Sequence, residues 1–466
     1  KINFHSENYL NKDNFIKLIL LIFVFILIYG SEFSDDLNHY HGGYIINTDN
    51  LNYIIGLNFL HHHYGYSSIW LILHSYLNFN GSLLQDIHIL NGIIYFSVVG
   101  LIINEILKNT KNKQVDNFYL ILIFLLFFIL IKYTRIKEFG IDRPGFLIIV
   151  FFFYYYFSFY FSGKENLTNY KNLLFISFFL FCIKIIFLPF FIISLVLMLK
   201  YLILNKSSDK ISTNYIFLLF FIFSSYLIKN ALISGCIIYP VDKTCLSFLS
   251  WNSNEIIQSL TLNTEYFNKS YNSYLGNLSP DLYIVDFNWL NNWYQRNSNE
   301  LLEYILVIAA SVIFSLISIN TYKSNKLNYN YIFYILLIIF IFSFLIALKT
   351  PVIRMFHHLF YIFGIFIILL ATSGKKVFIK KKPLYFFLII IIFFSLSKNI
   401  KRIYDNNFVN NPEELIKKIG WYETPKQKQL GSFEYFGGWN SKYPIGNEDL
   451  SNYKYRKFLF FNVIYK

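Results

Sequence analysis

The sequence predicts an all-α membrane protein that crosses the bilayer many times. Of its 466 residues, 55% are hydrophobic and 21% aromatic, whereas only 15% are charged. The apolar residues come in long unbroken blocks, such as 120–131 and 386–394, without the alternation of core and surface positions that soluble domains show. This composition excludes a disordered chain and an ordinary soluble protein.

The chain is strongly basic, with a formal net charge of +14. In a soluble domain this excess would indicate nucleic acid. In a membrane protein, Lys and Arg near the ends of the spans meet lipid headgroups. We therefore expect membrane lipids as partners of the basic residues, and no nucleic acid.

The apolar blocks predict about eleven transmembrane helices, each long enough to cross roughly 30 Å of hydrocarbon. The stretch 172–203 is too long for one span, and Pro189 near its middle removes a helix hydrogen bond. We therefore predict two short helices there, which meet at Leu188–Pro189. The other predicted spans lie near 15–30, 84–107, 116–132, 145–162, 214–232, 301–319, 329–348, 352–372 and 384–397.

Basic loops predict the sidedness, because loops rich in Lys and Arg tend to stay in the cytoplasm. Lysines before the first span place the N-terminus inside. We assign 1–397 to the transmembrane domain and 398–466 to an extracytoplasmic tail, although Lys398, Lys401 and Arg402 directly follow the last span. The outer loops of this topology are 31–83, 133–144, 233–300 and 349–354.

The first outer loop contains a mixed apolar and aromatic run, 54–70, that is too interrupted to be a span. We expect it to form helices that lie in the membrane interface. Its three consecutive histidines, 61–63, would point about 100° apart on a helix and could not all face one metal ion. The run therefore favours interfacial packing over a metal site.

Acidic and imidazole side chains follow the first predicted span. They are Asp35, Asp36, His39 and His41, with Tyr40 between the two histidines. A carboxylate at the rim of a membrane cavity can act as a general base, although acidic residues also cap helices. A divalent ion could use these residue types as well, but their adjacency is not a ligand spacing.

The second outer loop is unusually charged for its side of the membrane. It holds Arg135, Lys137, Glu138, Asp142 and Arg143. Basic residues on an outer loop run against the topological bias, so an anionic ligand is one explanation. Ion pairing with the neighbouring carboxylates is the other.

A further arginine, Arg354, stands at the start of a predicted span, three residues after Pro351. Its guanidinium offers a bidentate fork for phosphate and is costly to place in hydrocarbon. Snorkelling to the lipid headgroups would explain it equally well.

The large outer loop contains two cysteines, Cys236 and Cys245, which could form a disulfide in an oxidising compartment. Their spacing alone does not decide this. The loop is also rich in Trp, Tyr and Asn, a composition that suits stacking on sugar rings or an interfacial aromatic belt.

The order of these features resembles the GT-C superfamily of polyprenyl-linked-sugar glycosyltransferases, and more narrowly a group of bacterial multi-pass membrane proteins placed near it. The similarity spans nearly the whole chain, although each motif is short. Its motifs are Asp35-Asp36 before Tyr40-His41, the run 54–70, Ser234-Gly235 before Tyr239-Pro240, Pro351 before Arg354, and Gly438-Trp439-Asn440 before Tyr443-Pro444.

The resemblance implies roles for individual residues. The catalytic base would be Asp35 or Asp36, and the doublet leaves both open. A second acidic residue would be Asp142, and Arg354 would hold the lipid phosphate. Neighbouring side chains expected to contact the substrate are His39, Tyr40, His41 and Arg143.

The resemblance also implies a reaction. It is the inverting transfer of a sugar from a polyprenyl-phosphate donor to a glycan or lipid acceptor, on the extracytoplasmic face of the bacterial inner membrane, in surface glycan or lipopolysaccharide biosynthesis. A polymerase or ligase that uses polyprenyl diphosphate is an alternative, for which Arg135, Arg143 and Arg354 would be the cations. A flippase of lipid-linked glycan is another, with Lys184 as its main candidate for a cationic cavity.

Overall fold

The structure is a computed structural model of a mostly helical chain. It describes residues 12–29, 36, 40–49, 54–77, 89–109, 117–133, 141–162, 167–204, 213–323, 330–373, 375–405, 427–436, 444–446, 448–458 and 461–466.

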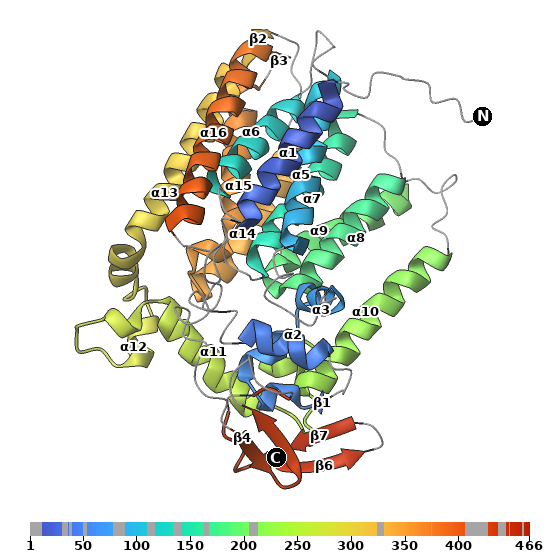
Figure 1. Cartoon of the computed structure of the whole chain (residues 1–466), viewed down its shortest axis with the longest axis vertical. Coiled ribbons are helices and arrows are strands. Elements are labelled where there is room, and N and C mark those ends of the chain that lie inside the picture. Colours follow the sequence, from blue (N-terminus) through green and yellow to red (C-terminus); the bar gives the residue numbers. More distant parts are fainter. Residues whose placement is uncertain are drawn as a thin grey trace.

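The described residues form fifteen α-helices and seven short strands (Figure 1). The helices are α1 (Lys12–Tyr29), α2 (Gly42–Asp49), α3 (Ile69–Tyr76), α5 (Ile89–Asn109), α6 (Asn117–Lys132), α7 (Asp142–Ser162), α8 (Leu167–Ile183), α9 (Leu188–Leu204), α10 (Thr213–Ser234), α11 (Asn254–Asn268), α12 (Pro280–Ile284), α13 (Leu290–Ile317), α14 (Asn330–Lys349), α15 (His357–Ala371) and α16 (Lys381–Asp405). The strands are β1 (Ile54–Ile55), β2 (Ile319–Lys323), β3 (Lys375–Ile379), β4 (Gln427–Leu430), β5 (Phe433–Phe436), β6 (Lys454–Phe458) and β7 (Phe461–Tyr465). The helical class is confirmed, whereas an all-α fold is wrong because it omits these strands.

Helix α6 is the core of the bundle. Every side chain from Leu120 to Ile129 is fully buried. A helix that is apolar on all sides must be covered on all sides, and α6 packs against α5, α7, α13, α15 and α16. These five helices therefore surround α6, whereas α10 stands apart from it (Figure 1).

Six described helices are long and apolar enough to cross a membrane, by length and composition, which indicates a multi-pass membrane protein. The predicted number of about eleven spans is therefore wrong. At 1.5 Å per residue, the 15 residues of α15 reach about 22 Å, which is short of the hydrocarbon thickness. The six helices are Ile89–Lys108, Ile185–Leu204, Asn214–Ser234, Leu290–Ile317, Asn330–Lys349 and Lys381–Tyr404, and the shorter apolar ones are Leu18–Ile28, Asn117–Lys132, Leu167–Ile183 and His357–Ala371.

The stretch 172–203 does contain two helices, as predicted. Helix α8 ends at Ile183 and α9 begins at Leu188, with a short 3-10 turn, Ile185–Phe187, between them. The break comes just before Pro189, whose ring cannot continue a preceding helix. The two helices pack against each other, and Lys184 lies in the break.

An antiparallel pair of strands lies at one end of the bundle. β2 follows α13, β3 precedes α16, and their register places Ile319 opposite Ile379. Lys323 pairs with Lys375 in the same ladder, so two of the loops predicted to share a side do meet. Figure 1 shows this pair at the upper end of the bundle.

The tail and the first loop meet at the opposite end (Figure 1). β7 pairs in parallel with β1, with Ile54 opposite Asn462, and antiparallel with β6. The Asn47 amide donates to the Ile445 carbonyl and accepts from its N–H, both at 2.9 Å. The 398–466 segment thus begins inside α16, which continues to Asp405, and ends beside the first loop.

The run 54–70 is less helical than predicted. It contains β1, two 3-10 turns (Leu57–Phe59 and His62–Tyr66) and the first residues of α3. Most of its side chains are buried rather than spread over an interface. The reason is that the tail covers it, since the Glu448 N–H donates to the Leu60 carbonyl.

Candidate functional site

The site begins with an ion pair between residues 318 positions apart. The Arg354 Nη2 lies 3.3 Å from the Asp36 Oδ2. Both side chains remain partly exposed, Arg354 by 46% and Asp36 by 35%. Ligands can therefore reach both groups.

Arg354 projects from a short 3-10 turn, Ile353–Met355, directly before α15. The Trp293 indole N–H donates to the Pro351 carbonyl at 2.6 Å, and the Met355 N–H donates to the Val352 carbonyl at 2.9 Å. These bonds fix the backbone on both sides of Arg354, and the ion pair with Asp36 orients its guanidinium.

A second ion pair joins α7 to the break between α8 and α9. Asp142 is the first residue of α7, and its Oδ1 lies 2.5 Å from the Lys184 Nζ. The pair is less accessible than the first, with 23% of Asp142 and 14% of Lys184 exposed. The break therefore carries a lysine towards the same end of the bundle as Arg354.

Tyr40 and His41 lie near both ion pairs. Burial raises the pKa of the Tyr40 phenol well above its ordinary value, and the Asp36 and Asp142 carboxylates raise it further. Burial lowers the pKa of His41 to about 3; Asp142 opposes this shift, whereas Lys184 and Arg354 add to it. The packing agrees with this, since the Phe187 ring of the break lies 6.0 Å from the ring of His358, which follows Arg354 closely in the sequence. Segments that are distant in the sequence therefore come together here.

Histidines of the first loop border this centre. The Tyr40 ring lies 4.2 Å from the His41 ring and stacks on the His63 ring at 4.7 Å, measured between centroids. His61 lies 6.0 Å from Tyr40. These neighbouring rings keep the Tyr40 phenol and the His41 imidazole largely out of water.

Protonation of His41 gives a prediction for stability. Its pKa falls from 6.5 to about 3 on folding, so between these values the unfolded chain takes up a proton that the folded chain does not. The contribution of His41 to the free energy of unfolding is therefore fully present above about pH 6.5. It is lost as the pH falls, by about 1.4 kcal/mol per pH unit. Between about pH 7 and pH 5, we expect wild type to lose about 2 kcal/mol more than His41→Gln.

Thermal unfolding of both proteins in detergent at the two pH values measures this difference. The comparison uses the pH-dependent change within each protein, so a general destabilisation by the substitution does not affect it. Equal losses in the two proteins would contradict a neutral, buried His41.

The structure brings some of the predicted site residues together and does not bring others to the site. Asp36, Tyr40, His41, Asp142 and Arg354 come together as described above. Arg143 lies towards a neighbouring cluster, since its charge lowers the pKa of the Tyr133 phenol that burial raises. Five candidates fall outside the described residues: Asp35, His39, Arg135, Lys137 and Glu138.

Sequence reasoning missed two features of this region. The first is the pairing of Lys184 with Asp142, because the sequence indicated Lys184 only as a candidate for the cationic cavity of a flippase, although its position beside a predicted helix break was a usable signal. The second feature is a polar network at the start of α15, where the His357 ring bonds to the Tyr133 hydroxyl at 2.7 Å and to the Tyr304 hydroxyl. Nothing in the local sequence connects these three residues, since Tyr133 directly follows α6, Tyr304 lies in α13 and His357 begins α15.

A metal site is not formed by the described residues. Among them, no group of three or more His, Cys, Asp or Glu side chains is placed to hold an ion. The predicted ligands Asp35 and His39 lie outside the described part, so the acidic doublet carries no metal assignment.

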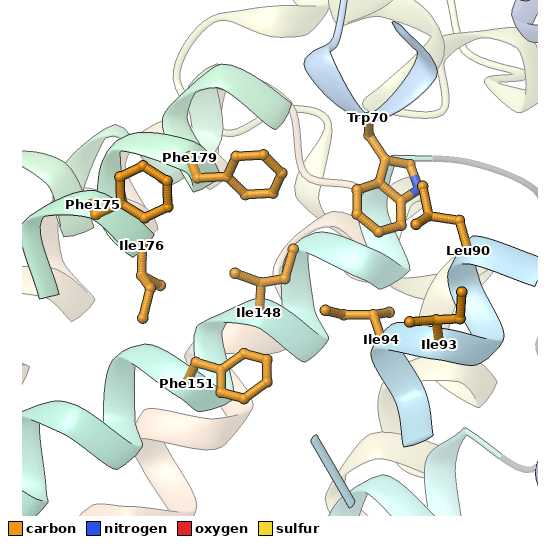
Figure 2. Close-up of a pocket in the computed structure, with 9 residues that line it drawn as sticks. All are labelled: Trp70, Leu90, Ile93, Ile94, Ile148, Phe151, Phe175, Ile176 and Phe179. Carbon is orange, nitrogen blue, oxygen red and sulfur yellow. The ribbon is translucent and has the colours of Figure 1, made fainter. Parts of the chain in front are cut away.

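An apolar groove of about 210 Å³ runs beside the site. Figure 2 shows its lining side chains pointing towards one another from α3, α5, α7 and α8. Ile148 lies six residues after Asp142 on α7, and Phe179 lies five residues before Lys184. The groove therefore shares α7 with Asp142, and α8 ends just before Lys184. The lining residues are Trp70, Leu90, Ile93, Ile94, Ile148, Phe151, Phe175, Ile176 and Phe179.

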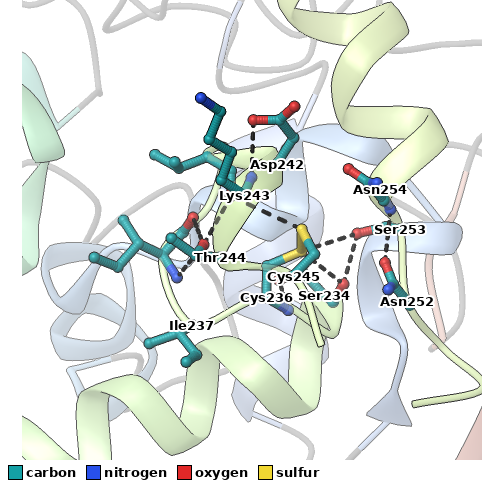
Figure 3. The surroundings of a disulfide bond; sticks show 12 residues. Ser234, Cys236, Ile237, Asp242, Lys243, Thr244, Cys245, Asn252, Ser253 and Asn254 are labelled. Atoms are coloured by element: carbon teal, nitrogen blue, oxygen red, sulfur yellow. Dashed lines mark hydrogen bonds between the residues drawn. A yellow bond between two sulfur atoms is a disulfide. The ribbon is translucent and has the colours of Figure 1, made fainter. Parts of the chain in front are cut away.

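Cys236 and Cys245 form a disulfide in the loop after α10 (Figure 3). The Thr244 hydroxyl lies inside the closed loop and donates towards the Ile238 and Val241 carbonyls at 2.8 and 2.7 Å. The Ser253 hydroxyl donates to the Ser234 carbonyl at 2.6 Å and connects the loop to the residues before α11. The disulfide thus stabilises the conformation of the large loop.

Removing this disulfide is expected to lower stability. With a sequence separation of nine residues, the loop-closure entropy gives about 2–3 kcal/mol. Reductant should therefore lower the melting temperature of wild type and leave the Cys236→Ser/Cys245→Ser variant unchanged. The free Cys182 is present in both proteins, so an equal response would assign the effect to another cause.

Residues 1–361 match the domain of unknown function DUF8201. The chain belongs to the DUF8201 family. The DUF8201 match includes Asp36, Asp142, Lys184 and Arg354, whereas the tail strands that cover the first loop lie beyond it. No curated protein and no solved structure matches the chain.

Proposed function

We propose that the chain is a membrane glycosyltransferase that moves a sugar from a polyprenyl-phosphate donor to an acceptor hydroxyl, with inversion at the anomeric carbon. The observation that carries this proposal is the accessible Asp36–Arg354 ion pair, which sets a carboxylate beside a guanidinium on a rigid turn. One group can accept a proton and the other can bind phosphate.

The two groups exchange partners during the reaction. Arg354 donates to the phosphate oxygens of the donor, and this releases Asp36 from the guanidinium. The acceptor oxygen attacks the anomeric carbon, while the bond from that carbon to the phosphate oxygen breaks and its electron pair leaves with the phosphate. The acceptor proton passes to the Asp36 carboxylate. Arg354 stabilises the charge that develops on the departing phosphate.

The apolar groove supports a lipid-linked donor. It lies along α7, which begins at Asp142, and along α8, which ends just before Lys184; Figure 2 shows its apolar lining. An isoprenoid chain has no polar atoms and would bury apolar surface there, which is favourable at about 25 cal/mol per Å². The phosphate at its head would then stand among the charged residues.

The distribution of basic residues supports an extracytoplasmic site. The β2–β3 end of the bundle carries Lys323 and the cluster 375–382 with its lysines, which favours the cytoplasm for that end. Asp36 and Arg354 belong to the opposite half, with the first loop and the tail. This polarity, together with the GT-C resemblance, favours the outer face of the bacterial inner membrane.

A transfer assay tests the proposal. The full chain in nanodiscs is incubated with pooled polyprenyl phosphate sugars and candidate acceptors, and released polyprenyl phosphate is measured. We expect release by wild type and none above background by Asp35→Ala/Asp36→Ala. Release that persists in this double variant would exclude both aspartates as the base.

A polymerase or ligase that uses polyprenyl diphosphate is the second candidate. It is favoured by Lys184, a second cation near Arg354, because a diphosphate carries more negative charge than a phosphodiester. Release of polyprenyl diphosphate when polyprenyl diphosphate sugars are supplied as donors, with no release of the monophosphate from the monophosphate donors, would select it.

A further inference from the structure

The break between α8 and α9 holds Lys184 in a fixed place. Its backbone is extended, with φ −157° and ψ 136°, and its N–H still donates to the Leu180 carbonyl at 3.1 Å. Its own carbonyl accepts from the Phe187 N–H, also at 3.1 Å. The side chain thus leaves the helix axis and extends to Asp142.

Stability alone gives little reason for a charged pair here. Lys184 is followed by Ile185, Ile186 and Phe187, and it is mostly buried. Moving an ammonium and a carboxylate out of water costs several kcal/mol per ion, so apolar residues of similar volume would be about as stable. A lysine that is still 14% exposed remains available to a ligand.

The position of Lys184 relates it to both the groove and Arg354. The groove lining on α8 ends at Phe179, five residues before it. The break also packs beside the turn of Arg354, since the Phe187 ring, three residues after Lys184, lies 6.0 Å from the His358 ring, four residues after Arg354. Lys184 and Arg354 both act on the imidazole of His41. A phosphate bound at one of these cations would therefore lie near the other.

We infer that Lys184 is a second cation that binds the phosphate of a polyprenyl lipid beside Arg354. This inference deepens the proposed function and rests on it for the nature of the donor. Each cation is paired with a carboxylate in the structure, Lys184 with Asp142 and Arg354 with Asp36. The lipid phosphate replaces the carboxylate at each cation, so its charge is neutralised at two points.

Binding of named lipids tests this role. Polyprenyl phosphate, polyprenyl diphosphate and neutral polyprenol are titrated against the full chain in phosphatidylcholine nanodiscs. We expect Lys184→Gln to weaken binding of both anionic lipids about tenfold or more, since a charge-assisted hydrogen bond is lost. Diphosphate should lose more than monophosphate, polyprenol should be unaffected, and Lys184→Arg should retain most of the affinity.

Asp142→Asn is the matched control, because it breaks the same ion pair but keeps the cation. It should bind the anionic lipids as tightly as wild type or more tightly. Equal weakening by Lys184→Gln and Asp142→Asn would show that the pair only joins α7 to the break. Unchanged affinity in Lys184→Gln would also overturn the inference.

The transfer assay separates this inference from the proposed function. Sugar transfer by wild type, with full lipid affinity in Lys184→Gln, would overturn the role of Lys184 and retain the transferase. The expected binding pattern without transfer from any donor would retain the lipid phosphate site and overturn the transferase.

Discussion

Asp36→Asn is expected to lower sugar transfer about a hundredfold or more while leaving the affinity for polyprenyl phosphate intact or higher. Asparagine has nearly the shape of aspartate but cannot accept the acceptor proton. The substitution also removes the carboxylate that lies 3.3 Å from Arg354, so the guanidinium is released for phosphate. The turnover number should fall, and the dissociation constant should not rise.

Asp35→Asn is the natural comparison for this variant, since the sequence leaves both aspartates open as the base. Only the substitution of the true base should lower turnover. Loss of transfer in Asp35→Asn alone would move the base to Asp35. Full transfer in both single variants and in the double variant would refute a carboxylate base in this doublet.

Arg354→Gln is expected to weaken binding of polyprenyl phosphate about 10- to 100-fold. A hydrogen bond to a charged group contributes about 1.5–3 kcal/mol, and each 1.4 kcal/mol is a factor of ten in affinity. Arg354→Lys should fall between wild type and Arg354→Gln, because lysine keeps the charge but loses the planar fork. Titration of the lipid into nanodiscs measures all three affinities.

Arg296→Gln provides the matched control. Arg296 is an exposed arginine on α13 whose guanidinium lies 5.5 Å from the Phe267 ring centroid. Its removal changes the net charge by the same amount, so its affinity should equal that of wild type. Equal weakening by both substitutions would indicate general electrostatic attraction and contradict a phosphate site at Arg354.

The membrane class and the break near Pro189 were predictable because they depend on short stretches of sequence. A window of about 20 apolar residues partitions into lipid whatever the rest of the chain does. Proline prevents a helix hydrogen bond wherever it stands. The number of spans was overestimated for a related reason: an apolar block such as 352–372 does not show that its helix, α15, is only 15 residues long.

The residues of the candidate site could be predicted from the sequence, but the ion pairs that they form could not. Asp36, Asp142 and Arg354 stood out as charged residues beside apolar blocks. No sequence pattern connects Asp36 to Arg354 across 318 positions, or Asp142 to Lys184. The fold of the tail was even less predictable from the sequence, because β7 is defined by its pairing with β1.

The helical, membrane-bound character of the chain and most of its candidate charged residues can be read from the amino-acid sequence. These properties follow from local partitioning and local backbone chemistry. The ion pairs of Arg354 with Asp36 and of Lys184 with Asp142, and the position of Tyr40 and His41 near both pairs, depend on the tertiary structure. Such contacts depend on how the helices pack around α6, and that packing is a property of the whole chain.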